Sequence, residues 1–165
     1  MTVIATGDEM RAFGEALSRV LRAGDLVLLT GPLGAGKTTL AQGIGAGLGV
    51  RGPIASPTFI IARTHPSEVG GPSLIHVDAY RLTSLDELDH LDLDATLEDS
   101  VTLVEWGQGK AEALSQDRLH IVIERERGGE FDPDQADAGA RTVTITGHGP
   151  RWDGVDLDVL KGAGA

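Results

Sequence analysis

The residues GPLGAGKTT, at positions 31–39, match the phosphate-binding pattern G-x-x-x-x-G-K-[ST]. In this pattern the glycines let backbone N–H groups close around phosphate oxygens, and the helix that follows adds the positive end of its dipole. Lys37 is expected to reach the terminal phosphates as a point charge, and the Thr38 hydroxyl to ligate Mg²⁺. The residues predicted to bind the nucleotide through this loop are Gly31, Leu33, Gly34, Ala35, Gly36, Lys37, Thr38 and Thr39.

Two apolar segments that follow the loop end on acidic residues. LIHVD ends on Asp78, and TLVE ends on Glu105. Mg²⁺ bound to phosphate keeps several waters, which carboxylates at the ends of neighbouring strands can hold. One carboxylate would hold the magnesium shell and the other would orient an attacking water, and the sequence leaves open which does which. For either residue alone, a solvated strand end or a helix cap is an equally good interpretation.

The loop needs a strand before it and a helix after it, and the hydrophobic pattern indicates both. Residues 26–29 are a short apolar run, typical of a strand covered on both faces. Residues 37–48 have a helical pattern, although Gly43, Gly45 and Gly47 lower its helix propensity. Close packing of this helix on a neighbouring element would explain these glycines.

The remaining elements predict the fold class. Thr6 and Glu9 form a capping-box signal for a helix that Gly24 would end. Strands are predicted at residues 2–6, 59–64, 73–80, 101–106, 119–126 and 141–147, with a turn-rich connection that favours a hairpin between the second and third. We therefore expect a single α/β P-loop NTPase domain, with a mainly parallel central sheet flanked by helices and an antiparallel edge. This domain would span residues 1–150, with a polar loop at 128–140 and a tail at 151–165.

Length and charge restrict the possible functions. The chain has 165 residues, a formal net charge of −11 and no cysteine. The length suits one domain, and the absence of cysteine fits a reducing compartment. A large nucleic-acid surface needs clustered Lys and Arg, so any contact with RNA would come through a partner. No apolar run approaches the ~20 residues that cross a bilayer, and no signal peptide opens the chain. A cytoplasmic protein without membrane contact is expected.

The sequence also bears on the nucleotide and the reaction. It contains no asparagine and so cannot contain the Asn-Lys-x-Asp element of small GTPases, which favours ATP. A small-molecule kinase of the P-loop class would need arginines on a lid. The candidates are Arg125 and Arg127, which we interpret as solvent-facing charges on an edge strand. The residues alone thus predict a Mg²⁺-dependent ATP-binding domain, with a kinase or a nucleotide-dependent scaffold as alternatives.

Three further segments carry a resemblance to a known family. They are SPTF at 56–59, HVDAYR at 76–81 and VEWG at 104–107. Together with the loop at 31–39, in this order and spacing, they resemble the TsaE family, also called YjeE. Members are bacterial P-loop ATPases required for making threonylcarbamoyladenosine, the modified base beside the anticodon of tRNAs that read codons starting with A.

The resemblance implies roles for particular residues. Thr58 would lie in a switch-like segment facing the γ-phosphate, and Trp106 would lie close to the nucleotide. Asp78 and Glu105 would be the acidic pair inferred above. The residues implied in catalysis are thus Lys37, Thr58, Asp78 and Glu105, and those implied in magnesium binding are Thr38, Asp78 and Glu105.

The same resemblance implies partners. The chain would dock on the TsaD and TsaB proteins, with TsaD carrying the transferase site. It would hydrolyse ATP only or mainly when docked, and hydrolysis would reset the complex between rounds. An acidic chain agrees with tRNA being bound by the partners, so that contact with tRNA is indirect.

Overall fold

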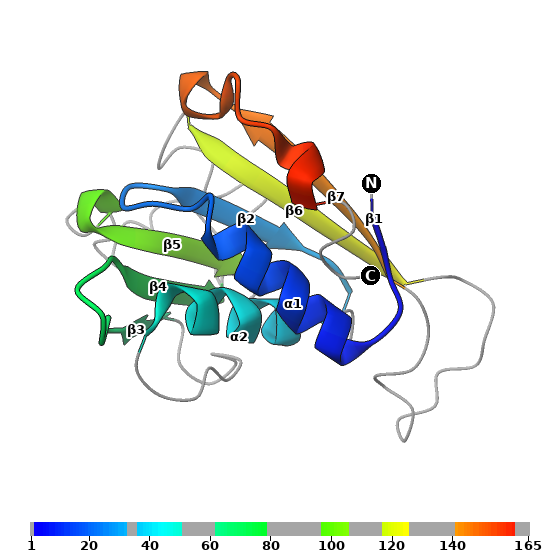
Figure 1. Cartoon of the computed structure of the whole chain (residues 1–165), viewed down its shortest axis with the longest axis horizontal. Coiled ribbons are helices and arrows are strands. Elements are labelled where there is room, and N and C mark those ends of the chain that lie inside the picture. Colours follow the sequence, from blue (N-terminus) through cyan, green and yellow to red (C-terminus); the bar gives the residue numbers. More distant parts are fainter. Residues whose placement is uncertain are drawn as a thin grey trace.

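A mixed β-sheet forms the framework of the molecule (Figure 1). The structure is a computed structural model that describes residues 2–32, 36–50, 62–78, 97–105, 117–125 and 141–160. The strands of this part of the chain are β1 (Thr2–Ile4), β2 (Leu26–Thr30), β3 (Ala62–His65), β4 (Ser73–Asp78), β5 (Ser100–Glu105), β6 (Arg118–Arg125) and β7 (Arg141–His148). The α-helices of the same part are α1 (Gly7–Ser18) and α2 (Lys37–Leu48). The polar loop predicted at 128–140 lies outside the described residues.

The strand order confirms the predicted fold class. In the described residues the sheet has seven strands in the order β1-β7-β6-β2-β5-β4-β3. The central strands β6, β2, β5 and β4 are parallel, whereas β3 pairs antiparallel with β4, and β7 pairs antiparallel with both β6 and β1. The predicted hairpin is therefore the β3–β4 pair. The expectation of an edge strand for Arg125 is wrong, because β6 is hydrogen-bonded on one side to β2 and on the other to β7.

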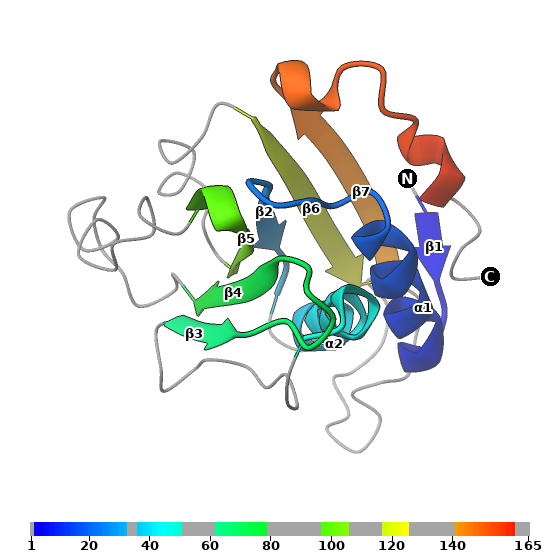
Figure 2. The ribbon, with the colours of Figure 1, turned by 60° about the vertical axis from the view of Figure 1, so that its left-hand side comes forward.

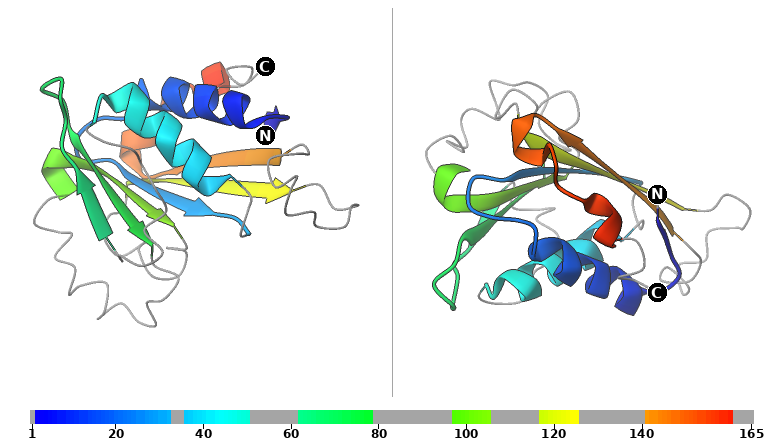
Figure 3. Two further views of the ribbon diagram at one scale, coloured as in Figure 1. Left: turned by 90° about the horizontal axis from the view of Figure 1, so that it is seen from below. Right: turned by 45° about the horizontal axis from the view of Figure 1, so that its top comes forward.

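Helices α1 and α2 lie together over one face of the sheet (Figure 3). Alternate residues of the strands point to this face and pack against the apolar sides of the helices. The buried residues that form this core include Phe13, Leu17, Val27, Leu29, Leu40, Ile44, Leu103 and Ile121. None of the described helices is long and apolar enough to cross a membrane.

The two helices cross at backbone contact. A Cβ atom added at Gly14 of α1 would lie 2.6 Å from the carbonyl oxygen of Leu40 in α2. A Cβ atom at Gly43 of α2 would overlap the carbonyl oxygen of Arg11, and one at Gly47 would overlap the hydroxyl of Ser18. Close packing therefore explains these two glycines of α2, as the sequence indicated.

Helix α1 begins as predicted but ends earlier. The Thr6 hydroxyl accepts a hydrogen bond from the backbone N–H of Glu9 at 3.1 Å, which is an N-cap. The helix ends at Ser18, so the predicted end at Gly24 is wrong. The backbone carbonyl of Val20 instead accepts a hydrogen bond from the Arg151 guanidinium, at 2.8 Å. No local pattern indicates this contact, which joins residues 131 positions apart.

Residues 150–160 pack on the core. They contain the 3₁₀ turns η5 (Pro150–Trp152) and η6 (Leu157–Leu160). Figure 2 shows η6 beside α1 and β1. Trp152 and Leu160 are both buried and belong to the same core as α1.

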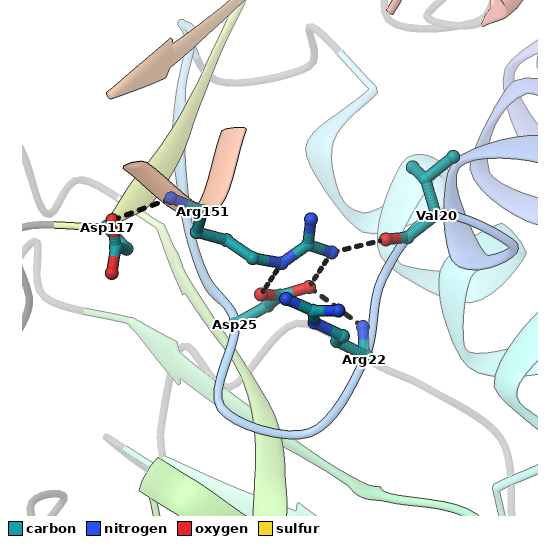
Figure 4. Close-up of polar contacts among 5 residues, drawn as sticks. All are labelled: Val20, Arg22, Asp25, Asp117 and Arg151. Carbon is teal, nitrogen blue, oxygen red and sulfur yellow. Dashed lines mark hydrogen bonds and ion pairs between the residues drawn. The ribbon is translucent and has the colours of Figure 1, made fainter. Parts of the chain in front are cut away.

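A buried ion pair holds this segment to the start of β2 (Figure 4). Arg151 donates from Nε and Nη2 to the two carboxylate oxygens of Asp25, at 3.0 Å and 3.1 Å. The same carboxylate accepts from the backbone N–H of Arg22 at 2.8 Å. The backbone N–H of Arg151 donates to Asp117 at 3.0 Å, and its guanidinium lies over the Trp152 ring. These contacts join the α1–β2 connection, the start of β6 and the C-terminal segment.

Candidate functional site

The glycine-rich loop at 31–36 leaves the sheet at its centre. It follows β2, which lies between β5 and β6, and it leads directly into α2. After β5 the chain crosses β2 and re-enters the sheet on the far side as β6. This is a switch point of strand order, and ligands of open α/β sheets bind outside the carboxyl ends of the strands at such a point.

Local geometry fixes the end of the loop at the first turn of α2. Gly36 has φ 103°, in the left-handed region that glycine adopts without strain. A Cβ atom here would lie 3.3 Å from Cε of Met10, so α1 packs against the loop. The backbone N–H groups in the first turn of an α-helix have no partners within the helix, so the start of α2 could receive an anion.

Lys37, the first residue of α2, is folded onto the loop. Its side chain is buried, with 7% of the residue exposed. The Nζ atom donates to the carbonyl oxygen of Gly31 at 2.5 Å. The ammonium group therefore lies beside the carbonyl oxygens of Gly31 and Pro32, at the start of the loop. Thr38 and Thr39 follow in the same first turn of the helix.

The two predicted acidic residues meet at one edge of the sheet. Asp78 and Glu105 are register partners in the parallel pair β4–β5, each at the last position of its strand. Glu105 is also the register partner of Leu29, two residues before the loop begins. The structure thus brings the backbones of Asp78, Glu105 and Gly31 together at the carboxyl ends of adjacent strands.

Glu105 has a partner that sequence reasoning did not identify. His76 of β4 lies two residues before Asp78, and its Nε2 atom is 2.9 Å from Oε2 of Glu105. Both residues are buried, with exposed fractions of 0% for His76 and 3% for Glu105. The signal was present, since residues two apart in a strand share a face and Asp78 was already singled out.

Oxygen is the donor type that this site offers to a metal. The Glu105 carboxylate, with Thr38 and Asp78 nearby in the fold, is the kind of ligand that Mg²⁺ prefers. No cluster of three or more His, Asp or Glu side chains within the described ranges could hold a metal by itself.

Some predicted site residues fall outside the part of the chain that the structure describes. They are Leu33, Gly34, Ala35, Thr58 and Trp106. For Asp78 the structure describes the backbone within β4. The part of the site that the structure describes therefore consists of the two ends of the glycine-rich loop, the first turn of α2, and the last residues of β4 and β5.

These features define an α/β domain with a glycine-rich strand–loop–helix element at a switch point of the sheet and acidic strand ends beside it. A family model described as "Threonylcarbamoyl adenosine biosynthesis protein TsaE" matches residues 4–131. The chain belongs to the TsaE family, as its ordered motifs indicated, and that family takes part in tRNA threonylcarbamoyladenosine biosynthesis.

Individual relatives agree with this assignment. The tRNA threonylcarbamoyladenosine biosynthesis protein TsaE of Streptomyces coelicolor is 58% identical over 93% of this chain and 100% of its own length. The protein of the same name from Mycobacterium tuberculosis H37Rv is 52% identical over 72% of this chain and 74% of its own. The crystal structure of Bacillus subtilis YdiB superposes with a TM-score of 0.67, at 32% identity, over 92% of this chain and 86% of that chain.

Proposed function

We propose that this chain is a Mg²⁺-dependent ATPase subunit that acts with the TsaD and TsaB proteins in threonylcarbamoyladenosine modification of tRNAs reading codons that start with A. Membership of the TsaE family supports the pathway. The observation that supports nucleotide hydrolysis is the meeting of Asp78 and Glu105, in register, beside the strand that leads into the glycine-rich loop.

The residues of the site have distinct tasks in this proposal. The loop and the first turn of α2 bind the phosphates through backbone N–H groups. Lys37 exchanges its contact with the Gly31 carbonyl for phosphate oxygens, which keeps a positive charge where negative charge develops. Thr38 and one of the acidic residues hold Mg²⁺, and the other acidic residue orients the attacking water. When bound, Mg²⁺ would neutralise charge on the β- and γ-phosphates.

The resemblance supplies the remaining parts of the proposal. Thr58 faces the γ-phosphate, and Trp106 lies against the nucleotide. The net charge of −11 supports indirect contact with tRNA, because a polyanion is repelled by an acidic surface. Docking on TsaD and TsaB then confines rapid hydrolysis to the assembled complex.

The test is release of phosphate from ATP by the purified protein, alone and with TsaB and TsaD added. Strong stimulation by the pair, absent when Lys37→Ala replaces the natural chain, is the expected result. No stimulation would overturn the proposed partnership. A phosphorylated small molecule formed without release of phosphate would establish the alternative, a kinase of the P-loop class.

A further inference from the structure

His76 is a buried histidine that the proposed chemistry does not use. It lies in β4, where its register partner is Leu103 of β5, two register positions further into the sheet than the pair Asp78 and Glu105. Its ring therefore lies below the ends of β4 and β5, on the face of the sheet that carries the Glu105 side chain. The Nε2 atom lies 2.9 Å from Glu105 Oε2, within ordinary hydrogen-bond distance.

The chemistry of the pair fixes the direction of the hydrogen bond. A carboxylate in its charged form only accepts, and Nε2 of His76 is then the donor to Glu105. The other ring nitrogen, Nδ1, is buried and has no hydrogen-bond partner among the described residues. An apolar side chain of similar volume would fill this position without burying an unpaired polar atom, which is unfavourable. Packing alone therefore does not account for a histidine here.

We propose that His76 is a positioning residue for Glu105 and that it sets the affinity of the site for Mg²⁺. By holding Oε2, the imidazole fixes the carboxylate in one orientation and leaves Oε1 for the metal or its bound water. A glutamate without this bond rotates about three side-chain torsions and must be ordered at each binding event. This inference rests on the proposed function, because it assigns Glu105 to the magnesium shell.

The experiment compares side chains that differ in one donor. Gln at position 76 places its amide N–H close to the position of the imidazole Nε2, whereas the shorter Asn does not reach it and Leu has no donor. His65→Leu, which changes another buried histidine on the neighbouring strand β3, is the matched control. For each protein, calorimetry gives the affinity for a non-hydrolysable ATP analogue in EDTA and across a Mg²⁺ titration.

The Mg²⁺ titration gives the Mg²⁺ concentration at which half of the increase in affinity for the analogue is reached. His76→Leu should raise this concentration by about 10–100-fold, the usual loss of metal affinity when a residue that orients a metal ligand is removed. Its affinity for the analogue in EDTA should stay at the natural value. His76→Gln should have the same Mg²⁺ requirement as the natural chain. The control His65→Leu should also have the natural Mg²⁺ requirement. Should His76→Leu fail to fold, the comparison of His76→Gln with His76→Asn tests the same donor with polar side chains.

A double-mutant cycle shows whether His76 acts through Glu105. In a Glu105→Ala background, adding His76→Leu should change the Mg²⁺ requirement no further. The inference is overturned if His76→Leu, or His76→Asn, binds the Mg²⁺ complex as the natural chain does, or if the effect persists in Glu105→Ala. If the natural chain binds the nucleotide equally well with and without Mg²⁺, the proposed Mg²⁺-dependent function is wrong. This result is seen in the natural chain, so it is distinguished from a failure of the role given to His76.

Discussion

The ion pair between Asp25 and Arg151 should contribute strongly to the stability of the domain. Their side chains are 4% and 13% exposed, so neither charge is well solvated. Arg151→Met keeps an unbranched apolar side chain but removes the guanidinium over Trp152, its two bonds to the carboxylate and its bond to the Val20 carbonyl. The Asp25 carboxylate would then keep one described donor, the backbone N–H of Arg22.

The expected cost follows from this geometry. Breaking a buried ion pair by removing one partner costs about 3–5 kcal/mol, and the remaining N–H donor places this case near the lower end, at about 3 kcal/mol. For a chain of this size, a melting temperature lower by roughly 6–12 °C should accompany that loss. Urea unfolding followed by circular dichroism measures the free energy, and calorimetry measures the melting temperature.

The chain offers a matched control for this measurement. Arg11 and Asp8 form a pair with the same 3.0 Å distance between nitrogen and oxygen, but their side chains are 50% and 96% exposed. Arg11→Met should therefore cost at most about 0.5 kcal/mol. Equal costs for the two arginine variants would refute the reasoning, because the difference in burial would then have no energetic consequence. Asp25→Asn combined with Arg151→Met should cost less than the two changes summed.

Further predictions concern the loop, the acidic residues and the helix crossing. Lys37→Ala should abolish tight ATP binding, and an unchanged affinity by calorimetry would remove the proposed phosphate contact. Asp78→Ala and Glu105→Ala should each lose partner-stimulated phosphate release, and full turnover by both would contradict their assignment to the magnesium and water positions. Gly43→Ala should destabilise the domain by about 1–2 kcal/mol, since overpacking outweighs the gain in helix propensity. Gly71→Ala, whose Cβ would lie 3.8 Å from the nearest atom, should change the unfolding free energy by less than about 0.5 kcal/mol.

Short sequence patterns were sufficient to predict the strands and the helix that carry the described part of the site. Helix α2 has the predicted bounds, and β2 and β5 lie within a residue of their predicted ranges. The apolar runs and the glycine loop are each read within a few residues of chain, so no distant contact is needed to recognise them. The meeting of Asp78 and Glu105 followed from the rule that parallel strands end at one edge of a sheet.

What could not be predicted depends on contacts between distant residues. Just after the end of α1, the carbonyl of Val20 accepts a hydrogen bond from Arg151, 131 residues further along the chain. The interior place of β6 depends on strand order, which hydrophobic alternation does not encode. The hydrogen bond between His76 of β4 and Glu105 of β5 joins residues that are 29 positions apart. The neighbours of β6 and the polar partner of Glu105 can be identified only once the strands are assembled into the sheet.

The pairing of the first strand with the last has a consequence for how this protein is made. Thr2 of β1 is matched with Val143 of β7, and Asp25 is joined to a residue 126 positions later. On the ribosome, β1 is therefore synthesised well before β7 and stays unpaired until β7 has emerged. Folds with so many distant pairings form slowly, and until closure the unpaired strand edges are open to aggregation. Chaperone dependence during synthesis, and insolubility of any chain cut before β7, are the expected costs of this arrangement.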